Sequence, residues 1–190
     1  LHTEAFERLC PLPSPTPHQL QRFLKTVPER ILPAQFTISL YVDGNCLPDA
    51  KGIQSVLDAH MLGTDVVDLV CWEHPTRTRV YDEAREVTKF HLETSKNVAD
   101  MLHKLTTEYS FSEAVDNGLT ETNVLLRRHC QSDVSRMHTA WSNAVAICRR
   151  DQISFDPLLR HFNVKYARLP NKEKPVQKRT HSGDTHLRTI

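Results

Sequence analysis

Apolar residues occur along the chain in two kinds of pattern, which predict two kinds of element. Short apolar or alternating runs, typical of β-strands, lie at residues 36–43, 66–72, 88–94, 144–148 and 164–169. Helical spacing of apolar residues appears at 17–28, 48–61, 97–109 and about 119–130, and a further helix is expected at 156–162. Because strands alternate with helices, the pattern predicts an α/β fold, a three-layer α/β/α sandwich with a mostly parallel sheet.

The pattern also divides the chain into three parts. Residues 10–17, CPLPSPTP, carry prolines that disfavour a helix, so we predict an N-terminal Pro-rich arm and helix over 1–35. The α/β domain is predicted over 36–169 and a basic C-terminal tail over 170–190. From residue 165 onward there are seven Lys or Arg against two Asp or Glu. Such a tail is typical either of a solvated terminus or of a segment that contacts phosphates.

Composition narrows the class of protein. The chain is 39% hydrophobic, enough for a sizeable core, and no apolar run approaches the roughly 18 residues of a membrane span. The five cysteines are odd in number and form no C-x-x-C pair, which indicates reduced thiols and an intracellular, reducing compartment. Since the chain begins with Leu1, removal of a transit peptide and a place in the mitochondrial matrix stay open as an alternative.

Three aspartates fall where the predicted elements place ligands. Asp43 ends the first strand, Asp100 lies early in the helix after the third, and Asp151 follows the fourth. In such sheets ligands bind beyond the carboxyl ends of the strands. Clustered carboxylates repel one another unless a cation joins them, and hard oxygen ligands select Mg²⁺ or Mn²⁺. The inferred chemistry is metal-assisted phosphodiester hydrolysis. Taken singly, each aspartate also fits a turn, a helix start or a cap.

Three motifs around these aspartates resemble a known family. Residues 41–45 (YVDGN), 96–100 (KNVAD) and 146–160 (AICRRDQISFDPLLR) are similar, in this order, to the motifs of a NYN domain of the PIN-like ribonuclease superfamily. The resemblance covers about residues 36–169 and implies a three-layer α/β fold that acts on RNA with Mg²⁺ or Mn²⁺.

The resemblance also implies roles for individual residues. Asp43, Asp100 and Asp151 would hold the metal, Asn45 would position the first carboxylate or a water, and Lys96 would contact the scissile phosphate.

The third motif departs from the family pattern. The glycine of Ser-Gly-Asp-x-Asp-Phe is missing, Ser154 stands at the second aspartate, and Arg149 and Arg150 precede Asp151. Arginines beside a pocket either pair with its carboxylates and displace a metal, or hold a phosphate.

The sequence therefore predicts one of two functions in RNA processing. One is a metal-dependent endoribonuclease, and the other is a catalytically inactive PIN-like scaffold or RNA-binding subunit of a ribonucleoprotein or multi-protein assembly. The expected partners are RNA and other proteins, and no membrane. A small-molecule phosphate enzyme ranks last, because neither a P-loop nor G-x-G-x-x-G is present.

Overall fold

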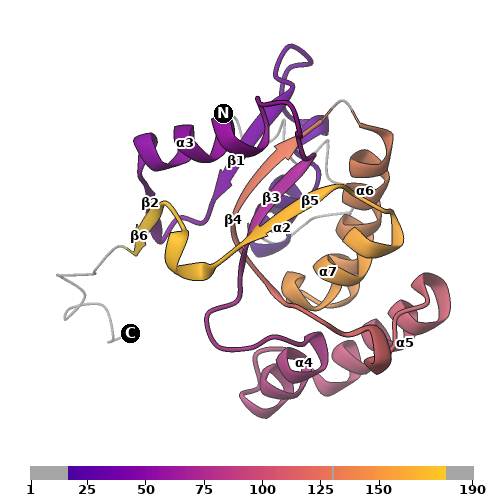
Figure 1. The fold of residues 1–190 in the computed structure, drawn as a ribbon. Helices are drawn as coiled ribbons and strands as arrows, with labels where there is room; N and C mark the ends of the chain where they lie inside the picture. The colour runs from indigo at the N-terminus through magenta and orange to yellow at the C-terminus, as the bar shows by residue number, and fades with distance from the viewer. Residues whose placement is uncertain (1–16, 130, 179–190) are drawn as a thin grey trace.

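The computed structural model describes residues 17–129 and 131–178, which form an α/β fold (Figure 1). The α-helices are α2 (Pro17–Thr26), α3 (Ala50–His60), α4 (Val80–Lys89), α5 (Ser95–Tyr109), α6 (Ser132–Ile147) and α7 (Asp151–His161). The strands are β1 (Ile38–Val42), β2 (Cys46–Pro48), β3 (Leu69–Glu73), β4 (Thr120–Arg128), β5 (Tyr166–Leu169) and β6 (Val176–Lys178). Single 3₁₀ turns are η1 (Pro28–Arg30), η2 (Glu113–Val115) and η3 (Asn171–Glu173). None of the described helices has the length and apolar character needed to cross a membrane.

The main sheet has four strands in the order β1-β4-β3-β5. Strand β4 pairs antiparallel with both β1 and β3, and only β3 and β5 run parallel. The sheet is therefore mixed, and the expectation of a mostly parallel sheet is wrong. A second, two-stranded sheet joins β2 to β6, so residues 176–178 of the predicted tail pair with the body of the domain.

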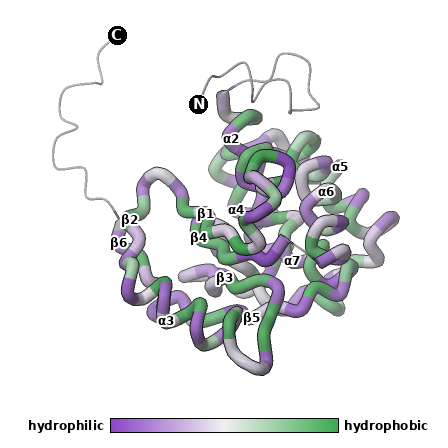
Figure 2. The backbone as a smooth tube through the Cα atoms, turned by 90° about the horizontal axis from the view of Figure 1, so that it is seen from above, coloured by the Kyte–Doolittle hydropathy of each residue, from purple (hydrophilic) through white to green (hydrophobic). Residues whose placement is uncertain are grey.

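Helices pack on both faces of the main sheet. Along β3, Leu69 and Cys71 point into the larger core formed with α4 to α7, whereas Val70 and Trp72 point into a second core formed with α3. Figure 2 shows α3 on one side of the strands and α6 and α7 on the other. A strand buried on both faces reads as a continuous apolar run, which is why the sequence predicts β3 correctly.

Three predicted elements differ from the structure. The run at 144–148 continues α6, whose buried positions Met137, Trp141, Ala144 and Val145 follow helical spacing. The region 119–130 is strand β4, buried on both faces, and the predicted strand at 88–94 begins inside α4. Short apolar runs do not distinguish a buried strand from a buried helix. Because β4 replaces two expected strands at the centre of the sheet, the pairing becomes antiparallel.

Helix α2 packs on the body of the domain as an integral element. Phe23 and Val27 are buried together with Leu20 and Ile31 beside them. The buried guanidinium of Arg127, on β4, donates to the backbone carbonyl of Lys25. Helix α2 also contacts α6. The predicted arm at residues 10–17 lies outside the described residues, apart from Pro17.

Candidate functional site

A polar pocket of about 170 Å³ opens where β1 ends and α7 begins. Asp43 follows the last residue of β1, and its backbone N–H donates to the carbonyl of Asn123 on β4 (2.8 Å). Asp151 is the first residue of α7. The predicted residues that line this pocket are Asp43, Asn45 and Asp151. Three of the five site residues expected from the sequence therefore come together.

The ammonium of Lys25, from α2, lies between the two aspartates. Its Nζ is 2.6 Å from Asp151 Oδ2 and 3.9 Å from Asp43 Oδ1. It also donates to Thr122 Oγ1 (3.1 Å), and this hydroxyl donates to Asp151 Oδ2 (2.7 Å). The Lys25 side chain is 1% exposed. Helix α2 thus delivers a buried positive charge to the position that a metal ion would take.

A second basic residue of α2 completes the neutralisation of Asp151. Arg22 Nη1 lies 3.0 Å from Asp151 Oδ1, so both carboxylate oxygens face a cationic group. Burial alone would raise the pKa of Asp151, but Lys25 and Arg22 together lower it. Burial lowers the pKa of Lys25, and Asp151 and Asp43 oppose that effect. Asp151 is therefore ionised and held in a buried ion pair.

Asp43 has a neutral partner as well. The hydroxyl of Tyr41 donates to Asp43 Oδ1 over 2.6 Å. Burial and this hydrogen bond raise the pKa of Tyr41, so the phenol stays protonated at neutral pH. Asp43 directly follows β1 and lies two residues after Tyr41, a spacing that puts both side chains on the same side of an extended backbone. The Asp43 carboxylate is positioned by its own strand.

Asp100 and Lys96 do not line this pocket. They lie one turn apart on α5 and pair with each other, with 2.5 Å between Lys96 Nζ and Asp100 Oδ2. The Lys96 side chain is 81% exposed and that of Asp100 is 48% exposed. Their expected place at the sheet edge followed from a strand at 88–94, which is absent, so α5 does not start from the end of a strand.

The two arginines before Asp151 pair with glutamates that the sequence did not single out. Arg149 donates from its backbone N–H and its Nε to Glu93 Oε2, both over 3.0 Å. Arg150 Nη2 lies 3.5 Å from Glu83 Oε1, and Arg77 contacts the same carboxylate. Neither arginine is paired with Asp43 or Asp100. Glu93 stands just before α5 and its side chain is 1% exposed, so only the folded arrangement identifies it.

We expect Glu93 to stabilise the folded protein at neutral pH and to lose this effect in acid. Burial alone would raise its pKa, but the hydrogen bonds from Arg149 and the Thr94 backbone lower it to about 2. A carboxyl whose pKa falls on folding contributes stability above its unfolded pKa and loses it as the pH falls toward the folded value. Because the Arg149 side chain is 54% exposed, we discount the effect to roughly 2 kcal/mol.

The measurement is urea unfolding of the wild type and Glu93→Gln between pH 7 and pH 2. The wild type should be more stable at pH 7, and the difference should shrink below about pH 4 and vanish as the pH falls through about 2. A difference that stays constant across this range would contradict the assignment. Glu108→Gln, in an exposed pair on α5, is the matched control and should show almost no change.

The pocket does not fit the Mg²⁺ or Mn²⁺ that the resemblance implies. A divalent cation needs free carboxylate oxygens, yet Lys25 and Arg22 take both oxygens of Asp151. Lys25 and Tyr41 face Asp43 Oδ1. Asp100, the third expected ligand, is outside the pocket. The described geometry therefore leaves neither oxygen of Asp151 free and provides one of the three expected ligands, Asp43, with a single free oxygen.

The residues that the sequence analysis missed are Arg22 and Lys25. They lie three residues apart on α2, a spacing that places them on one helix face, but basic residues on a helix face usually contact water. Only the docking of α2 shows that they enter the pocket.

Comparisons with protein families, with curated proteins and with solved structures find no match to this chain.

Proposed function

We propose that this chain is a catalytically inactive, RNA-binding domain of NYN or PIN-like type that serves as a subunit of a ribonucleoprotein or multi-protein assembly. The observation that carries the proposal is the Lys25 ammonium between Asp43 and Asp151. A nuclease of this kind needs a metal at such carboxylates. A resident ammonium supplies the neutralising charge in its place, without the chemistry of a metal.

We also propose that this domain is a three-layer α/β/α sandwich. Separate hydrophobic cores lie on the two faces of the main sheet, one with α3 and one with α4 to α7. This supports a sandwich of the PIN-like kind, although the sheet is mixed. The YVDGN motif ends β1 at the pocket, as the resemblance implies.

Two guanidinium groups in the pocket support binding of a phosphate. Arg22 and Arg150 both line it, and within residues 17–129 and 131–178 the Nε atom of each is buried without a hydrogen-bond acceptor. Buried donors without an acceptor are costly, and guanidinium groups match phosphate oxygens in geometry. A phosphate of the RNA backbone would supply the acceptors.

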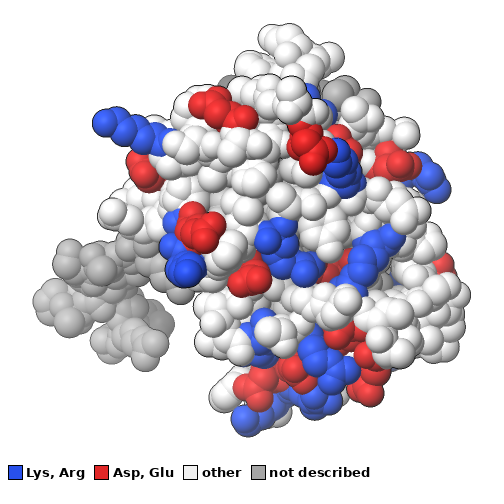
Figure 3. Space-filling model, viewed as in Figure 1, with Lys and Arg blue, Asp and Glu red and all other residues white. Residues whose placement is uncertain are grey.

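The surface charge supports a local contact with RNA. On the face shown in Figure 3, acidic and basic side chains are interspersed. An extended basic face, typical of proteins that follow a long stretch of backbone, is not seen on this side. We therefore expect RNA binding through few phosphates, with a shallow dependence on salt.

We expect the 190-residue chain to bind labelled single-stranded RNA without cleaving it, in the presence of Mn²⁺ or of EDTA. Arg150→Gln should weaken binding and reduce the slope of log affinity against log salt by about 0.7, the value for one phosphate contact on a single strand. Fluorescence anisotropy at several salt concentrations measures both effects. Arg136→Gln, at an exposed ion pair on α6, is the matched control.

Two results would overturn the proposal. One is absence of RNA binding. The other is Mn²⁺-dependent cleavage that Asp43→Asn abolishes, which would establish the endoribonuclease alternative and require α2 to leave the pocket. Cleavage that survives Asp43→Asn would indicate a contaminating nuclease, and a repeat with repurified protein then has to show binding without cleavage for the proposal to stand.

A further inference from the structure

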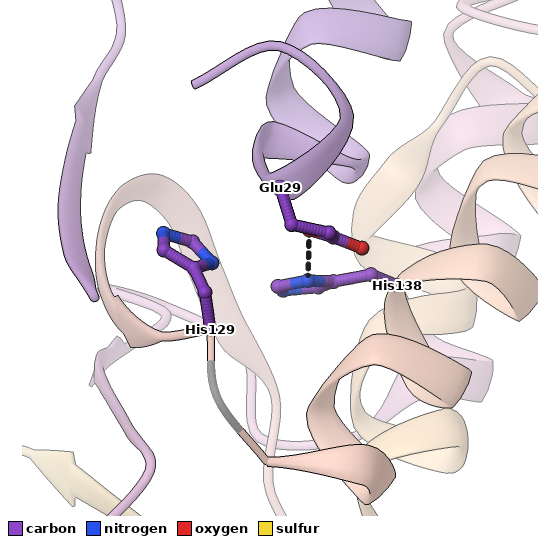
Figure 4. Close-up of side chains that lie close together, drawn as sticks. All are labelled: Glu29, His129 and His138. Carbon is purple, nitrogen blue, oxygen red and sulfur yellow. Dashed lines mark hydrogen bonds and ion pairs between the residues drawn. The ribbon is translucent and has the colours of Figure 1, made fainter. Parts of the chain in front are cut away.

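A second cluster of polar side chains shares no residue with the pocket. It contains Glu29, on η1, His129, just after β4, and His138, on α6. Figure 4 shows the three side chains pointing toward one another from these separate elements. One ligand atom from each residue lies within 4.8 Å of those of the other two. Residues far apart in the sequence thus bring two imidazoles and one carboxylate to a single point.

Several polar atoms of this cluster are buried and unsatisfied. Within the described residues, Glu29 Oε1, His138 Nε2 and both ring nitrogens of His129 are buried and have no hydrogen-bond partner. The His138 side chain is 0% exposed. Native proteins leave few such atoms unpaired, and a missing ion is one of the ordinary explanations. Packing alone does not account for a buried histidine nitrogen and a neighbouring histidine ring that both have no hydrogen-bond partner.

One hydrogen bond joins two members of the cluster. His138 Nδ1 lies 2.9 Å from Glu29 Oε2. Since an ionised carboxylate only accepts, Nδ1 carries the hydrogen of this contact, and a metal ion held by both residues would take the place of that hydrogen. Neutral imidazoles are the form that binds metals.

We propose that Glu29, His129 and His138 form a binding site for Zn²⁺. Two histidines and one glutamate are the protein ligands of one type of zinc site, which keeps a further coordination position open. Zinc–nitrogen bonds of about 2.1 Å place tetrahedral ligand atoms roughly 3.4 Å apart, so these atoms approach one another by up to about 1.4 Å on binding. His129 is half-buried at the start of a loop and has no hydrogen bond through its ring to break.

The position of the site gives it a structural consequence beyond the proposed RNA contact. Glu29 lies on η1, which directly follows α2, whereas the histidines belong to the body of the domain. Zinc would fasten η1 to β4 and α6 and so hold α2, with Lys25 and Arg22, in the pocket. The nearby guanidinium of Arg127, which also lowers the pKa of both histidines, opposes a cation here. We therefore expect weaker binding than at sites with several anionic ligands.

The test uses Co²⁺ as a spectroscopic substitute for Zn²⁺ in the 190-residue chain. We expect one Co²⁺ per chain with visible absorption bands, displacement of that absorption by Zn²⁺, and a higher melting temperature with Zn²⁺. His129→Asn should lower the affinity about tenfold or more, because even residues that only support a ligand contribute that much. It should leave the melting temperature without metal almost unchanged.

Two further variants make the result decisive. Glu29→Gln keeps the shape of the side chain but removes its charge, and it should also weaken Co²⁺ binding. His103→Asn, at an exposed position on α5, should bind as the wild type does. Absence of saturable binding of one Co²⁺ per chain by the wild type, or equal affinity in wild type, His129→Asn and Glu29→Gln, would overturn the proposal.

Discussion

Replacing Lys25 by Met should destabilise the protein by about 3 kcal/mol, the lower end of the range for a buried charge that loses its partner. The side chain is 1% exposed, and its removal leaves Asp151 with Arg22 and Thr122 alone. Asp43 would lose its nearest cation in the same step. The free energy of unfolding, measured by urea denaturation at pH 7, reports the change.

The control for this prediction is Lys89→Met, at a pair with Glu86 in which the lysine is 65% exposed. Exposed pairs contribute roughly 0–1 kcal/mol, so this variant should be nearly as stable as the wild type. Combining Lys25→Met with Asp151→Asn should recover part of the loss, because the uncompensated charge is then gone. A loss below about 1 kcal/mol for Lys25→Met would show that Lys25 is not a buried partner of Asp151.

Asp156→Ala should cost about 3–5 kcal/mol, the range for a buried ion pair that loses one member. Asp156 is completely buried on α7, accepts from Thr120 N (2.7 Å) and Thr120 Oγ1 (2.9 Å), and pairs with Arg168 on β5. One carboxylate therefore joins α7 to two strands of the main sheet. Its loss leaves the Arg168 side chain, which is only 16% exposed, without its anionic partner.

Urea denaturation again measures the effect, beside the control Asp133→Ala. Asp133 lies in the first turn of α6, is 50% exposed and pairs with Arg136. Its removal should cost about 1 kcal/mol or less. Equal losses in the two variants would contradict the role of Asp156 as a buried link.

Several elements could be predicted because local pattern decides them. The apolar run of β3, the YVDGN motif that ends β1 and the spacing of Val98, Met101 and Leu105 on α5 each identify their element. The predicted elements were wrong where the same apolar residues fit both the period of a strand and the period of a helix. Ala144 and Val145 suit a short strand, yet they continue the buried face of α6 that includes Trp141.

The sequence predicted the part of the candidate site that depends on local position in the chain. Asp43, Asn45 and Asp151 stand at the ends of elements, and the structure brings them together. The partner of the aspartates, Lys25, could not be predicted, because its burial depends on how α2 docks against distant residues. Glu93 and Glu83 were missed since no motif distinguishes them from surface glutamates. Long-range contacts decide these cases, and local propensity does not report them.

The docking of α2 has a consequence for the order in which the chain folds. Lys25 and Thr122 are 97 residues apart in the sequence, and Asp151 lies further still toward the C-terminus. Contacts of such high sequence separation form late, because the entropy of closing a long loop is lost before the contact contributes any favourable free energy. During synthesis, α2 leaves the ribosome before its binding surface exists. Among the described helices α2 is made first, and it can dock only after β4 and α7 have been made.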